Sequence, residues 1–66
     1  MKFNERLKEL RLHSSFMQKD IAKMLDISVR AFQRYESGDA EPNIEKLIKL
    51  ANFFDVTLDD LMCRYQ

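Results

Sequence analysis

The chain has 66 residues, of which 45% are hydrophobic and 33% charged, with one glycine and one proline. This composition excludes a disordered or low-complexity chain, and the length leaves room for one domain, residues 1–66. The net charge of zero argues against a nucleic-acid partner, yet residues 1–34 carry +4 (eight bases, four acids) and residues 35–66 carry −4 (three bases, seven acids).

Two helices are predicted at the start of the chain. Apolar residues recur there at helical spacing: Phe3, Leu7 and Leu10. This spacing predicts a helix over about residues 3–13, which "HSS" (13–15) interrupts. A second helix fits residues 18–25, and Asp26, which tolerates left-handed backbone geometry, follows it.

Three more helices follow, each with a recognisable start. Ser28 is a good N-cap for the third, and Gly38 stands just past its end, where a left-handed residue is needed. Asn43 can cap a fourth helix that keeps helical spacing through five apolar residues: Ile44, Leu47, Ile48, Ala51 and Phe54. Thr57 and Asp60 resemble a capping box that opens a short fifth helix. We therefore expect an all-α fold of five short helices.

The link between the second and third helices is short, about three residues ("DIS"). Such a link predicts a steep crossing, as in a helix-turn-helix, rather than a flat antiparallel pair. A steep crossing requires a small residue where the backbones approach, and Ala22 fits that place. We expect Ile27 to fill the turn and Phe32 and Tyr35 to anchor the third helix.

The third helix divides into two sides when its residues are placed at 100° intervals. With Val29 at 0°, Gln33 falls at about 40°, Arg30 at about 100° and Arg34 at about 140°. The apolar residues fall between about 200° and 300°: Ala31, Tyr35 and Phe32. The polar set suits base edges, since Arg pairs with guanine, Gln with adenine, and a small apolar group contacts the thymine methyl. The alternative is an ordinary solvated helix face.

The sequence resembles the lambda-repressor/Cro-like helix-turn-helix family, whose members are small five-helix DNA-binding regulators of bacteria and their phages. The resemblance is carried by "LKELR", "QKDIAKMLDIS", "FQRYESG" and "EPNIEKLIKLANFFDVTLDDLM", and it covers about residues 3–62. It implies that the third helix lies in the major groove of double-stranded DNA with the second helix crossing above it.

The resemblance also implies roles for single residues. Gln18 is expected to touch a phosphate and to brace the third helix, and Ser28 to donate to the DNA backbone. Base edges or nearby phosphates are expected to be faced by four residues: Val29, Arg30, Gln33 and Arg34. Lys19 can reach a phosphate, although a plain surface charge is an equal alternative. Arg11 and Glu36 fall where the family often pairs its first and third helices.

The sequence departs from the family pattern at three places. Asp26 replaces the usual glycine of the turn, and Ser14 and Ser15 stand where a glycine is often found. Met17 replaces the Ser or Thr that usually caps the second helix, so we expect a weaker cap and the loss of a phosphate contact. None of these changes alters the expected fold.

A homodimer is expected because closed two-fold assembly is the commonest choice for such domains. Leu58, Met62 and Tyr65 lie on one stripe of the last helix and are candidates for its interface, with Phe53 and Leu50 as possible contributors. The alternative is that the stripe completes the core of the monomer, which for Leu58 is equally reasonable. Dimers of this kind bind half-sites about 34 Å apart.

These observations predict a sequence-specific DNA-binding transcriptional regulator, a repressor that blocks a promoter. The alternative is a protein-interaction module that keeps the fold, which the zero net charge and the acidic C-terminal half favour. No catalytic constellation or phosphate loop is visible, so we expect no enzyme, cofactor or small-molecule ligand. His13 has no partner at metal spacing and Cys63 is the single cysteine, so no metal site or internal disulfide is expected. Without a signal peptide or membrane-length apolar run, a cytoplasmic location follows.

Overall fold

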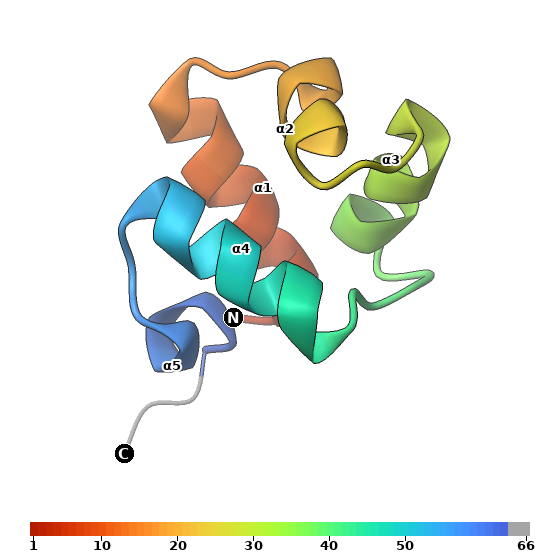
Figure 1. Ribbon diagram of the computed structural model, residues 1–66. Helices are drawn as coiled ribbons and strands as arrows, with labels where there is room; N and C mark the ends of the chain where they lie inside the picture. Colours follow the sequence, from red (N-terminus) through yellow and green to blue (C-terminus); the bar gives the residue numbers. More distant parts are fainter. Residues whose placement is uncertain (64–66) are drawn as a thin grey trace.

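All five predicted helices are present in the computed structural model, which describes residues 1–63 (Figure 1). Their bounds are α1 Phe3–Ser14, α2 Gln18–Met24, α3 Val29–Ser37, α4 Ile44–Phe54 and α5 Leu58–Leu61. The described residues contain no strand. The prediction of an all-α fold with a helix-turn-helix at α2 and α3 is confirmed.

Side-chain oxygens begin three of the helices, as the sequence predicts. Each accepts a hydrogen bond from the backbone N–H three residues further on: Ser28 from Ala31 at 3.0 Å, Asn43 from Lys46 at 2.9 Å, and Thr57 from Asp60 at 3.0 Å. The start of α2 is held differently. Met17 provides no side-chain cap, but its own N–H donates to Asp20 Oδ2 at 2.9 Å, so a carboxylate in the first turn secures this helix.

Four connections between helices use left-handed residues. Their φ angles are 68° at Ser15, 58° at Asp26, 88° at Gly38 and 55° at Asp55. The sequence predicts this conformation at Asp26 and Gly38. Ser15 takes it in the α1–α2 connection, where the family often has a glycine, so a residue with a Cβ carries that turn.

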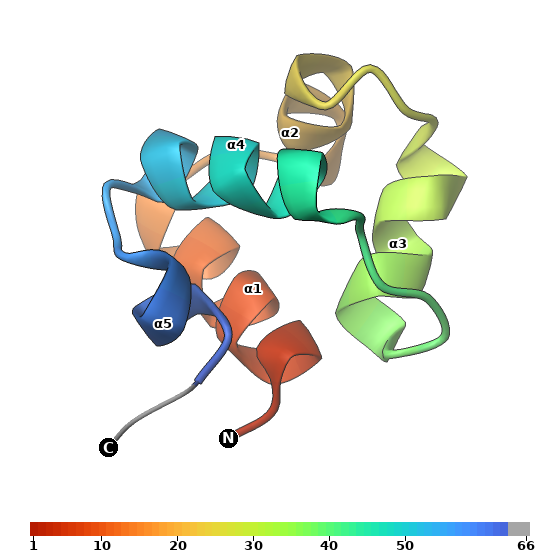
Figure 2. The same ribbon diagram turned by 60° about the horizontal axis from the view of Figure 1, so that its bottom comes forward.

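The core takes one fully buried large side chain from every helix. These are Leu7, Ile21, Phe32, Leu50 and Leu61. α4 crosses over α1, while α3 and α5 lie on opposite sides of the molecule in both views (Figures 1 and 2). Because every helix contributes to one cluster, the orientation of α3 is set by the whole core.

The inward face of α4 differs from the one expected. Ile44 and Ile48 belong to the apolar residues whose helical spacing predicted this helix, yet they are 61% and 47% exposed. Leu50, considered for a dimer contact, is fully buried. Helical spacing identifies an apolar arc but not which part of it the neighbouring helices cover. The described residues therefore leave open the flank of α4 that carries Ile44 and Ile48.

A charged cluster ties α1 to α5. Arg6 donates to Asp60 Oδ2 at 2.9 Å and forms a second ion pair with Glu9 one turn away. The hydrogen bond to Asp60, followed by that to Glu9, raises the pKa of Arg6 above its ordinary value. Arg6 therefore stays charged, and its ion pair with Asp60 joins the last helix to the first one.

Candidate nucleic-acid interface

The turn between α2 and α3 is closed by backbone and side-chain contacts. The N–H of Ile27 donates to the carbonyl of Ala22 at 3.0 Å, and Ile27 itself packs against the core. Ala22 has almost no exposed surface, so its small side chain allows the two helices to approach. Phe32 is fully buried and its ring meets Tyr35 edge-on at 6.5 Å. These contacts fix α3 from its inner side.

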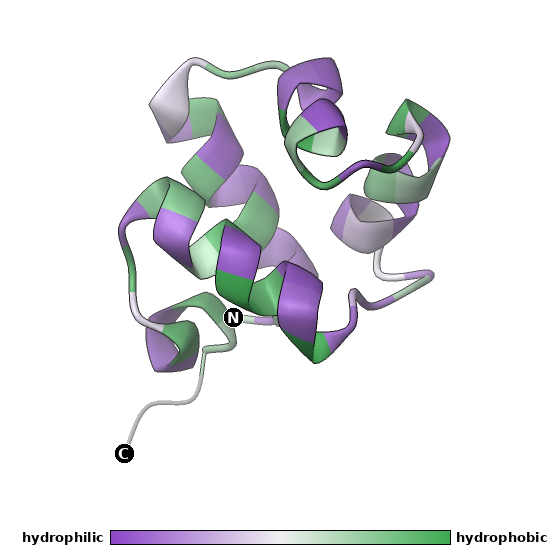
Figure 3. Ribbon diagram, in the orientation of Figure 1, coloured by the Kyte–Doolittle hydropathy of each residue, from purple (hydrophilic) through white to green (hydrophobic). Residues whose placement is uncertain are grey.

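The outer side of α3 carries the four residues that the helical angles predicted there. Val29 is 38% exposed, and Arg30, Gln33 and Arg34 are exposed as well. Along the ribbon of α3, hydrophilic and hydrophobic segments alternate, as in an amphipathic helix (Figure 3). Within residues 1–63, no hydrogen bond or ion pair involves the side chain of Arg30 or Arg34. Both cations are therefore available to an external anion or base edge.

A buried carboxylate joins α3 to α1. Arg11 binds Glu36 with two hydrogen bonds, from Nε to Oε2 at 2.7 Å and from Nη2 to Oε1 at 3.2 Å. The two side chains are 13% and 5% exposed. On the same junction, Asn4 Nδ2 lies 3.5 Å from the carbonyl oxygen of Glu36, near the end of α3. Arg–carboxylate pairs with two bonds fix orientation as well as distance.

Gln18 connects this pair to the outer side of α3. Its Nε2 donates to Glu36 Oε1 at 2.9 Å, and its Oε1 accepts from Gln33 Nε2 at 3.2 Å. The resemblance implied that Gln18 braces the third helix, but it did not identify Gln33 and Glu36 as the partners of Gln18. Gln33 and Glu36 stand three residues apart, on neighbouring turns of one helix, so one side chain of α2 can contact both.

Charge is unevenly distributed around α3. Exposed lysines lie on α2, at Lys19 and Lys23, and α2 packs against α3. The loop after α3 is acidic, with Asp39 and Glu41 both exposed. A polyanion is therefore attracted to the α2 side of α3 and repelled by the loop on its other side. Ser28 Oγ accepts from the Ala31 N–H, which leaves its hydroxyl hydrogen free to donate outward.

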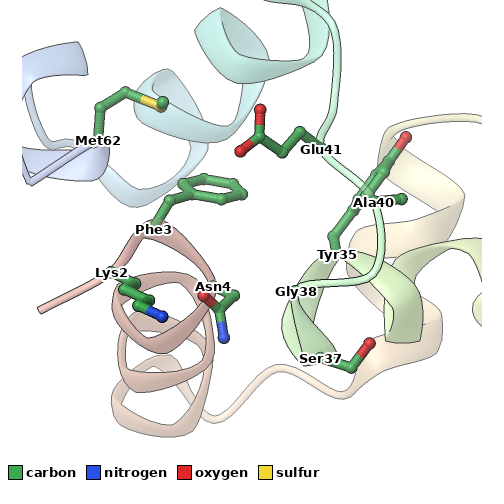
Figure 4. A pocket seen from close by; sticks show the side chains of 9 residues that line it. All are labelled: Lys2, Phe3, Asn4, Tyr35, Ser37, Gly38, Ala40, Glu41 and Met62. Carbon is green, nitrogen blue, oxygen red and sulfur yellow. The ribbon is translucent and has the colours of Figure 1, made fainter.

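The remaining predicted residues lie elsewhere. The prediction that Met62 lies on the last helix with Leu58 is wrong, because α5 ends at Leu61 and Met62 follows it. Leu58 and Met62 are both half-buried, and Tyr65 lies outside the described residues. Met62 lines a hollow of about 500 Å³ together with Phe3, Tyr35 and Glu41 (Figure 4). The described residues bring no three His, Cys, Asp or Glu side chains into an arrangement for a metal ion. No helix among them is long and apolar enough to cross a membrane.

Comparison with known proteins identifies the family. A family model described as helix-turn-helix matches residues 7–61. The chain belongs to the lambda-repressor/Cro-like helix-turn-helix family. Members of this helix-turn-helix family that resemble it include the HTH-type transcriptional activator BcrR of Enterococcus faecalis, 40% identical over 62 residues, which are 94% of this chain and 30% of BcrR.

Two further relatives of this helix-turn-helix chain are repressors. The cryptic phage CTXphi transcriptional repressor RstR of Vibrio cholerae is 34% identical over 65 residues, which are 98% of this chain and 58% of RstR. The chain spans between 30% and 58% of the length of these relatives. The P22 c2 repressor, solved in complex with a synthetic operator, superimposes with a TM-score of 0.86 and 27% identity, covering 94% of both chains.

Proposed function

We propose that this helix-turn-helix chain is a sequence-specific DNA-binding transcriptional regulator that inserts α3 into the major groove. The observation that carries the proposal is the outer side of α3, where two unpaired arginines stand beside an amide and a small apolar side chain. The similarity to a repressor solved with its operator supports this use of the fold. We also propose a cytoplasmic location, which is consistent with a helix-turn-helix regulator that acts on bacterial or phage DNA.

In this proposal each outward residue of α3 makes its own contact with a base or a phosphate of the operator. Arg30 and Arg34 bind guanine or a nearby phosphate, Gln33 reads adenine, and Val29 packs on a thymine methyl. Three residues at the starts of α2 and α3 contact the DNA backbone and so position the protein on the duplex: Gln18, Lys19 and Ser28. Arg11 and Glu36 stay inside the protein and hold α3 at a fixed angle to the rest of the core.

We further propose that the protein acts as a homodimer through an α4–α5 surface, defined as Ile44, Ile48, Leu58 and Met62. Phe53 packs on Phe16, with ring centroids 4.8 Å apart. Ile48 stands about 140° away from Phe53 around α4, on the flank opposite that contact. α5 packs against α4 (Figure 1). We propose that the exposed isoleucines of α4 form one apolar surface with the half-buried Leu58 and Met62.

A dimer would place two copies of α3 on half-sites about 34 Å apart, on one face of the duplex. Occupancy of a pseudo-palindromic operator that overlaps a promoter would then repress transcription. RstR and the P22 protein are repressors, whereas BcrR is an activator. We propose repression because the P22 repressor matches this chain over 94% of its own length.

Selection from a random pool of duplex oligonucleotides at controlled salt tests the proposal. We expect the wild type to enrich a two-fold symmetric sequence, and Arg30→Ala with Arg34→Ala to lose that enrichment. The matched control is Lys8→Ala with Lys49→Ala, which removes the same charge from exposed positions on α1 and α4. Failure of the wild type to enrich any sequence, or equal enrichment by the arginine variant, would refute the proposal.

A further inference from the structure

A continuous chain of hydrogen bonds runs from the buried Glu36 to the exposed Gln33. Arg11 occupies both oxygens of the Glu36 carboxylate, at 2.7 Å and 3.2 Å. Gln18 adds a third donor at 2.9 Å, and Gln33 then donates to Gln18 at 3.2 Å. The chain thus starts at a side chain that is 5% exposed and ends on the side of α3 proposed to face DNA.

The direction of every bond in this chain follows from the first one. A carboxylate only accepts hydrogen bonds, so the amide of Gln18 must turn its NH₂ group towards Glu36. The oxygen of Gln18 therefore faces away from Glu36, and the partner that meets this oxygen must be a donor. Gln33 consequently directs its own NH₂ group at Gln18, although an amide turned by 180° would occupy nearly the same space.

The orientation of the Gln33 amide matters because reading adenine requires an ordered pair of groups. The amide N–H donates to N7 of the base, and the amide oxygen accepts from the N6 amino group. A reversed amide would set oxygen against the N7 acceptor. After donating one N–H to Gln18, Gln33 keeps its second N–H and its oxygen, which are the two groups that this pairing uses.

We infer that Gln18 is a specificity-positioning residue, through which Glu36 fixes the orientation of the Gln33 amide and with it a preference for adenine. The inference rests on the proposed function, because it concerns how that site discriminates between bases. Gln18 acts here through Gln33, in addition to any phosphate contact of its own. A side chain held in its binding orientation before the encounter loses less entropy on binding, which favours the fixed reading.

The test separates base preference from overall affinity. Gln18→Met has a similar length and leaves the Arg11–Glu36 pair in place, but it cannot accept from Gln33. The base pair read by Gln33 is first defined as the position whose preference disappears in Gln33→Ala. At that position we expect Gln18→Met to reduce the preference for adenine about tenfold, measured by competition between singly substituted operators.

The matched control is Lys19→Met, at the next position of α2. Loss of a phosphate contact weakens binding to all sequences alike, so Lys19→Met should lower affinity and leave the preference for adenine unchanged. If Gln18→Met behaves like this control, Gln18 contacts only the DNA phosphate backbone, and the inference is wrong. It is also wrong if Gln33→Ala removes no base preference.

A second readout needs no DNA. In the free wild-type protein, NMR should show the side-chain amide of Gln33 shifted away from that of a solvated glutamine, and Gln18→Met should remove the shift. An unchanged Gln33 amide would overturn the hydrogen-bond chain itself.

The two experiments distinguish failure of the proposed function from failure of the inference. If the wild type enriches no sequence, the proposed function fails, while the NMR measurement still tests whether the hydrogen-bond chain exists. If the wild type binds a selected site and Gln18→Met keeps the preference for adenine, the inference alone fails.

Discussion

Glu36 helps to fix the placement of α3, together with the apolar core. It accepts hydrogen bonds from Arg11 and Gln18, on the first and second helices, while its own helix presents four outward residues to solvent. A buried charge that loses its partner is costly, whereas a pair that is removed together costs far less. The angle of α3 relative to α1 therefore depends in part on the Arg11–Glu36 pair, which makes no contact with DNA in the proposed complex.

We expect Arg11→Met to lower the free energy of unfolding by about 3–5 kcal/mol, because it leaves the Glu36 carboxylate buried without its cation. Changing both partners, Arg11→Met with Glu36→Leu, should recover part of this loss. Lys8→Met, an exposed change on the same helix, should stay within about 0.5 kcal/mol of the wild type. Urea unfolding measures all three variants, and equal effects of Arg11→Met and Lys8→Met would show that the pair contributes little.

At the scale of the helices, most of the fold could be predicted from local signals. Ser28, Asn43 and Thr57 begin helices because their short polar side chains accept from the third N–H of the helix, and sequence alone reveals this pattern. The two sides of α3 follow from its 100° spacing in the same way. Such signals depend on neighbours a few residues away.

The exposed flank of α4 could not be predicted in this way. Ile44 and Ile48 have the spacing of core residues, and their exposure depends on which flank of α4 the other helices cover. The hydrogen bonds from Gln33 to Gln18 and from Gln18 to Glu36 likewise span 15 and 18 residues of sequence. Pairings at this distance are set by tertiary packing. The resemblance implied the Arg11–Glu36 pair and a bracing role for Gln18, but not the two partners of Gln18.

Two left-handed turns should respond to substitution in opposite directions. Gly38 has a φ of 88°, and a Cβ there would lie 3.4 Å from Asn4 Cγ, so Gly38→Ala should cost about 1–2 kcal/mol. Ser15 already carries a Cβ at a φ of 68°, so Ser15→Gly should gain up to about 1 kcal/mol. Thermal or urea unfolding checks both signs. A stabilising Gly38→Ala would contradict the backbone assigned to the α3–α4 loop.

At the scale of the whole molecule, the proposed assembly depends on the α4–α5 surface. Ile48→Glu places a charge in this surface and should weaken self-association at least tenfold in sedimentation equilibrium, because an unpaired charge is costly to bury in an interface. Leu12→Glu is the matched control, since Leu12 is a 63% exposed apolar residue on α1, outside the surface. Equal association of both variants and the wild type would place the dimer contact elsewhere.

The proposed function depends on the outer side of α3. A competition experiment tests most directly whether this side recognises the DNA sequence. The affinity of the protein for its selected duplex is compared with that for a scrambled duplex at one fixed salt concentration, for the wild type and for Arg30→Ala with Arg34→Ala. We expect the wild type to prefer the selected duplex by at least about 1,000-fold, and the folded variant to lose most of that preference. A preference that survives removal of both arginines would contradict the account.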